Sequence, residues 1–179
     1  MTSLDSAIVE RATHAATQEV FQTMLDLEIL PLQAGEVAGQ SGPSEGVVSL
    51  IGLAGAWVGT GCISCSPALA CQLASRMLMS EFAAVDEDVL DAIAEITNMI
   101  IGNVKTALEE HLGPLGLSIP TVIYGRNFTT KSPGHSRWIV IPLACETEPF
   151  TVRVCLAPNR QPDASSRPGR SHPYPILTE

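Results

Sequence analysis

One stretch of the sequence, residues 86–112, constrains the fold more than any other. Its apolar residues recur every three or four positions from Ile93 to Leu108, without a proline, which predicts one long amphipathic helix. Three consecutive acidic residues at 86–88 suit the positive end of a helix dipole, and a Gly-Pro pair at 113–114 ends the helix. The apolar face is wide enough to pack against a sheet.

A polar stripe runs along the same predicted helix. Glu95, Asn98, Gly102, Lys105 and Glu109 follow one another at steps of three or four and therefore line one face. A carboxylate and a carboxamide are neighbours one turn apart, and the glycine after them leaves bare backbone. Such a surface could dock into the active site of another protein, but a solvated face is the commoner explanation of this spacing.

The other predicted elements indicate an α+β fold. Two glycines, Gly52 and Gly55, are expected to permit a tight turn between two aliphatic strands. Ser66 and Pro67 have the residue types of an N-cap and a first helical position. The expected elements are a helix over 4–27, a short strand near 32–37, a hairpin of 45–53 and 56–64, a helix from Pro67, and strands over 118–124, 137–145 and 150–156. Short connections favour a mostly antiparallel sheet with long helices packed on one face.

The chain is predicted to form one folded domain with a tail. Residues 1–157 carry all of the periodic apolar segments. Residues 158–179 are rich in Pro, Ser and Arg and have no apolar period, which predicts a disordered tail.

Composition excludes several classes of protein. The formal net charge of −9 argues against a nucleic-acid-binding protein, which needs a basic surface. There is no run of about 18 apolar residues, so we expect no insertion into a membrane, and the acidic N-terminus is unlike a signal peptide. Five cysteines without a framework spacing favour reduced thiols in the cytoplasm.

Other motifs in the sequence are weak. Cys62 and Cys65 have the spacing of a redox or metal-binding pair, but they fall at the end of a predicted strand, where positions i and i+3 face opposite sides. Cys71, Cys145 and Cys155 are interpreted as small apolar core residues. The four histidines are scattered, and the glycine-rich stretches lack the lysine of a phosphate-binding loop.

The segment around Glu95 resembles a known family. Glu95-x-x-Asn98, followed by Met99, Gly102 and Lys105, is similar to the signature of the CheX family of chemotaxis phosphatases, related to CheC and FliY. The resemblance extends over about 15–156, through the hairpin at 49–66, the strand and Gly-Arg turn at 120–128 and the closing strands at 138–156.

The resemblance implies a phosphatase of a CheY-like receiver domain. Asn98 would orient the attacking water and Glu95 would pair with the receiver's active-site lysine. The protein would need no cofactor of its own, because the receiver supplies Mg²⁺. The alternative is a non-catalytic binding module that docks on a receiver or a flagellar-switch protein.

The resemblance also implies one site per chain and a homodimer. A faint internal similarity relates the first helix to the central one, but in either alignment the first helix has no asparagine corresponding to Asn98. The family's dimers form through their sheets, and the strand ending at Leu156 is expected to be an edge strand available for such pairing.

Overall fold

The segment 86–112 forms the helix α3 (Glu87–Leu112) in the computed structural model, which describes residues 5–32, 44–128 and 138–159. The Asp86 side chain caps α3 by accepting a hydrogen bond of 3.0 Å from the Val89 N–H. At the other end Gly113 has a φ of 76°, a left-handed value that favours glycine. Both ends therefore follow from local sequence, as predicted.

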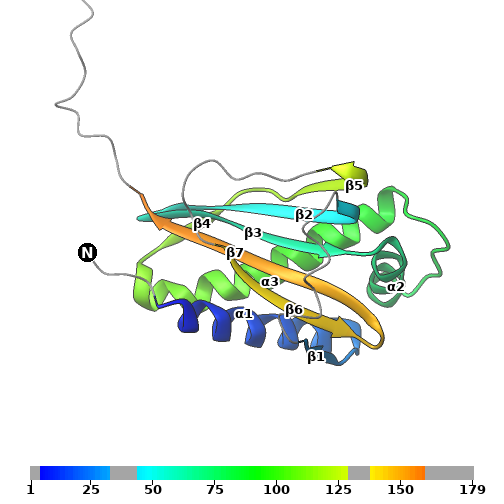
Figure 1. The fold of residues 1–179 in the computed structure, drawn as a ribbon, viewed down its shortest axis with the longest axis horizontal. Coiled ribbons are helices and arrows are strands. Elements are labelled where there is room, and N and C mark those ends of the chain that lie inside the picture. The colour runs from blue at the N-terminus through cyan, green and yellow to red at the C-terminus, as the bar shows by residue number, and fades with distance from the viewer. Residues whose placement is uncertain (1–4, 33–43, 129–137, 160–179) are drawn as a thin grey trace, which may run out of the picture.

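A seven-stranded antiparallel sheet lies under α3. Its order is β1-β6-β7-β3-β2-β4, and β5 also pairs with β2. The helices α1 (Ser6–Val20) and α3 run side by side across one face of the sheet, and α2 (Pro67–Leu78) lies at one end (Figure 1). The strands are β1 (Ile29–Pro31), β2 (Ser44–Gly55), β3 (Trp57–Cys65), β4 (Leu115–Leu117), β5 (Thr121–Phe128), β6 (Ile139–Cys145) and β7 (Glu148–Pro158). The predicted fold class is confirmed.

Several boundaries differ from the prediction for local reasons. The strand predicted over 118–124 is β5, which begins at Thr121 and continues to Phe128, and a short strand that was not predicted, β4, precedes it; the two lie end to end along β2. Gly52 is not in the hairpin turn: it pairs with Thr60 inside β2, and the turn lies beyond Gly55. The first helix changes to a π-helical turn, η1 (Phe21–Leu25), and ends at Asp26 in a left-handed conformation. The expected strand near 32–37 is β1, three residues earlier, and 33–37 lie outside the described residues.

The strand ending near Leu156 is not an edge strand, so that prediction was wrong. β7 pairs with β3 on one side and with β6 on the other. It also continues to Pro158, which pairs with Trp57. The chain beyond Asn159, where the tail was predicted, lies outside the described residues.

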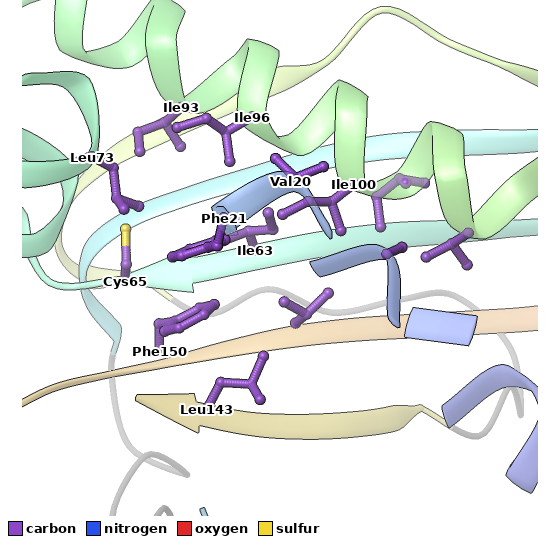
Figure 2. Close-up of a cluster of buried hydrophobic side chains, with 14 of the residues drawn as sticks. Val20, Phe21, Ile63, Cys65, Leu73, Ile93, Ile96, Ile100, Leu143 and Phe150 are labelled. Carbon is purple, nitrogen blue, oxygen red and sulfur yellow. The ribbon is translucent and has the colours of Figure 1, made fainter. Parts of the chain in front are cut away.

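The core fills the space between α3, α1 and the sheet. Phe21 and Phe150 stack with ring centroids 5.1 Å apart. Figure 2 shows Ile93, Ile96 and Ile100 of α3 pointing toward this aromatic pair and the sheet. The α3 isoleucines are almost completely buried, which fixes the rotation of the helix about its axis and hence the direction of its polar stripe.

Candidate active site on helix α3

The close approach of α3 to the sheet depends on a glycine in β3. A Cβ added at Gly61 would lie 2.5 Å from Cδ1 of the buried Ile101. Only glycine therefore lets the isoleucine rest on the strand at this point. The contact holds the middle of α3, from which Asn98 projects less than one turn away.

Glu95 and Asn98 lie on the face of α3 that turns away from the core. Glu95 is exposed and Asn98 is half-buried. Among the residues that the structure describes, neither side chain forms a hydrogen bond or an ion pair. A carboxylate and a carboxamide are thus both available to a partner, one turn apart on a rigid helix.

The other polar members of the stripe are bound within the protein. Lys105 Nζ lies 2.9 Å from Glu109 Oε1, and that oxygen also accepts a hydrogen bond of 2.8 Å from the Leu115 N–H. The Leu115 N–H, and next the Lys105 ammonium, lower the pKa of Glu109. This pair fastens the end of α3 to β4, so the stripe divides into an available half and a structural half.

A second asparagine on α3 has a structural contact that sequence reasoning missed. Asn103 Nδ2 donates a hydrogen bond of 3.3 Å to Glu19 Oε2 on α1. The two residues are 84 positions apart in sequence, and no local pattern signals their contact.

The first helix offers no second site. In the alignment that pairs Glu10 with Glu95, the position of Asn98 is held by Thr13. Thr13 is completely buried, and its hydroxyl donates a hydrogen bond of 2.7 Å to the Val9 carbonyl oxygen.

The cysteine pair does not form a dithiol site. Ile63 and Cys65 lie in the core under the helices, whereas Cys62 lies on the other face of β3, where Arg153 Nη2 donates a hydrogen bond of 3.3 Å to its sulfur. Burial raises the pKa of the Cys65 thiol to about 12. Cys145 and Cys155 are buried as predicted, and Cys71 is half-buried.

A metal centre or a cavity in the described part of the chain would be a second candidate site. Within it, no three His, Cys, Asp or Glu side chains are grouped so that they could hold a metal ion. A cavity of about 520 Å³ lies between α1, β1 and β6, and none of its lining residues belongs to α3. No described helix combines the length and apolar character needed to cross a membrane.

Comparisons with known proteins point to one family. The family described as "Chemotaxis phosphatase CheX" matches residues 47–144. The CheY-P phosphatase CheX of Thermotoga maritima is 31% identical over 128 residues, which cover 69% of this chain and 82% of that protein.

Solved structures share the same fold. The chemotaxis protein CheX from Vibrio vulnificus superposes with a TM-score of 0.73 at 26% identity, covering 87% of this chain and 100% of that one. The Borrelia burgdorferi structure of a CheX-CheY-BeF₃-Mg²⁺ complex gives a TM-score of 0.69 at 22% identity over 86% of this chain and 99% of that chain, a likeness of fold. With most of its length matched in sequence and in structure, the chain belongs to the CheX family of chemotaxis phosphatases.

Proposed function

We propose that this protein hydrolyses the aspartyl phosphate of a CheY-like receiver domain. The observation that carries the proposal is the pair Glu95 and Asn98, which are exposed or half-buried and have no hydrogen-bond or ion-pair partner among the described residues, whereas Lys105 and Glu109 of the same stripe are bound. The proposal is supported by family membership and by the relative whose name states CheY-P phosphatase activity.

In this proposal Asn98 acts by orientation. A carboxamide is not a base at neutral pH, but its C=O and NH₂ groups can hold a water molecule in line with the phosphorus. The water oxygen bonds to phosphorus, the P–O bond to the aspartate breaks, and inorganic phosphate and a free carboxylate result. Mg²⁺ is proposed to come from the receiver and to neutralise charge on the phosphoryl group.

Glu95 is proposed to dock the helix on the partner. Its exposed carboxylate, one turn before Asn98, would pair with a lysine in the receiver's active site. Gly102, one turn after Asn98, has no side chain to obstruct the receiver. We also propose that the protein lies in the cytoplasm, where receivers act, and that it forms a homodimer. Among the described strands, β5 is an edge strand that pairs only with β2, so its other side is available to a second copy of the chain.

The test is the loss of phosphate from a phosphorylated receiver of the same organism. The wild-type protein should accelerate it, and Asn98→Ala should reduce the acceleration ~100-fold or more, because water is no longer oriented. Asn103→Ala is a matched control on the same helix and should keep the activity. Full activity in Asn98→Ala would refute the mechanism.

The same assay separates docking from catalysis. Glu95→Ala should raise KM by about tenfold or more, with Glu110→Ala as the exposed control. An unchanged KM would remove the docking role of Glu95. Binding without faster phosphate loss would favour the alternative, a non-catalytic module that docks on a receiver or a flagellar-switch protein.

A further inference from the structure

A receiver that rests on Glu95 and Asn98 has to contact more than α3. Stable interfaces bury about 800 Å² on each partner, which takes roughly 20–30 residues a side. One turn of helix contributes two side chains. The docking surface must therefore continue onto an element beside α3. Apart from α2, which contacts α3 at one end of the sheet, the structure offers two flanks along the helix.

One flank is α1, which is joined to α3 by the Asn103–Glu19 hydrogen bond. Among its described residues, α1 exposes no large hydrophobic side chain. The other flank is formed by β4 and β5. Leu117 of β4 lies beside the bare glycine of the stripe, because a Cβ added at Gly102 would be 3.9 Å from Leu117 Cδ1. The available half of the stripe is thus continuous with this second flank.

The connector between β4 and β5 presents an unusual side chain. Ile119 is 86% exposed, although it is aliphatic and β-branched. A large exposed hydrophobic residue beside a polar rim is a feature of protein interfaces.

The backbone around Ile119 is held in place. The Ser118 N–H donates a hydrogen bond of 2.9 Å to the Gly52 carbonyl, and Ser118 Oγ accepts one of 2.9 Å from the Gly52 N–H. The same hydroxyl donates to the Ile119 carbonyl at 2.8 Å. Pro120 restricts Ile119 to extended conformations. Ordering this connector on binding would therefore cost little entropy.

A second exposed residue lies on the same flank. Tyr124 of β5 pairs with Val47, whose side chain is in the core, so Tyr124 is on the helix-bearing face of the sheet. Tyr124 is 51% exposed. β5 also contacts α3 directly.

We infer that Ile119 and Tyr124 form a second contact surface for the receiver domain, an apolar flank beside the polar stripe of α3. The inference rests on the proposed function, because it names the same partner. Ile119 anchors the partner by burial of its side chain, while Glu95 and Asn98 enter the receiver's active site. Ile119 sets affinity and does not touch the reacting atoms.

The test measures binding without turnover. The full-length protein is titrated with a receiver of the same organism loaded with Mg²⁺ and beryllium fluoride. Ile119→Ser should raise Kd about tenfold, and Tyr124→Thr should also weaken binding, whereas Ile119→Leu should restore wild-type affinity. The rate of phosphate loss at saturating protein should not change in Ile119→Ser. Leu30→Ser is the control, because Leu30 is 59% exposed on β1, at the opposite edge of the sheet.

The outcomes separate the two proposals. If the wild-type protein binds and Asn98→Ala is inactive, but Kd of Ile119→Ser stays within about twofold of wild type, only the second surface is refuted. An equal loss of affinity in Leu30→Ser also overturns the second surface. So does an Ile119→Ser variant whose sedimentation changes while its affinity for the receiver does not, because the flank would then serve a second copy of the chain. Failure of the wild-type protein to bind any receiver removes the proposed function and this surface with it.

Discussion

Two asparagines on α3 show how identical side chains acquire different roles. Asn103 is bound to Glu19 of α1, and Asn98, five residues earlier, has no partner among the described residues. The difference comes from the direction in which each projects, toward α1 or away from the core. An unbound carboxamide can orient a water molecule, whereas one that bridges two helices contributes to packing.

The lowered pKa of Glu109 should make the free energy of unfolding depend on pH. Its pKa is lowered in the folded state, chiefly by the Leu115 N–H and then by Lys105. A lowered pKa gives stabilisation that is complete above the unfolded value of about 4.3 and is lost as the pH falls through the folded value. Urea unfolding at pH 7 and pH 3 should therefore show a smaller loss of stability in Glu109→Gln than in wild type. Equal losses in wild type, Glu109→Gln and the exposed control Glu110→Gln would contradict this.

At the scale of elements, α3 is held by contacts of three kinds. Its buried isoleucines pack on the sheet (Figure 2), Glu109 fastens its end to β4, and Gly61 allows Ile101 to approach β3. A helix fixed along its length presents Glu95 and Asn98 in one geometry, as the proposed catalysis by orientation requires.

Gly61→Ala should displace α3. The new methyl group would overlap the buried Ile101, and such overpacking costs about 1–3 kcal/mol. Ile101→Ala alone should lower the free energy of unfolding by about 2–5 kcal/mol. The double variant Gly61→Ala/Ile101→Ala should lose about 0.5–3 kcal/mol less than the sum of the two single losses, because the shortened side chain no longer overlaps the new methyl group. Denaturant unfolding measures all three variants. Gly116→Ala, where a Cβ would lie 3.5 Å from the Ala54 oxygen, is the control. Strict additivity would show that the two sites do not interact.

In the molecule as a whole, the last described residue, Asn159, is tied to the far end of the sheet. Asn159 closes β7 against the β2–β3 turn: its N–H donates to the Ala56 carbonyl at 2.8 Å and its side chain to the Gly55 carbonyl at 2.9 Å. Contacts with the sheet thus continue to Asn159, two positions past the residue at which the folded domain was predicted to end.

A chain that ends after Asn159 should keep the melting temperature of the full chain and sediment as a homodimer. A chain that ends after Leu156 loses the pairing of Ala157 and Pro158 with β3 and the two hydrogen bonds of Asn159. The two hydrogen bonds alone are worth about 1–3 kcal/mol, so Tm should fall by at least about 2–4 °C. Calorimetry and sedimentation velocity measure both chains. A large loss of Tm in the longer chain would show that residues 160–179 belong to the folded domain.

Local sequence was enough to predict the helices, the hairpin and the placement of Glu95 and Asn98 on one face of α3. Helix caps, apolar periods and the spacing along one helix are local, so residues a few positions apart specify them. The same locality explains why sequence spacing alone makes Lys105 and Glu109 equal members of the stripe.

Contacts between distant segments determine which polar residues of α3 are bound within the protein and which of the described strands lie at the edges of the sheet. The Asn103–Glu19 and Glu109–Leu115 bonds, the place of β7 between β3 and β6, and the split of β4 from β5 depend on partners that only the fold brings together. Strand order and side-chain partners are set by packing of the whole sheet against α1 and α3, and no single segment encodes that packing.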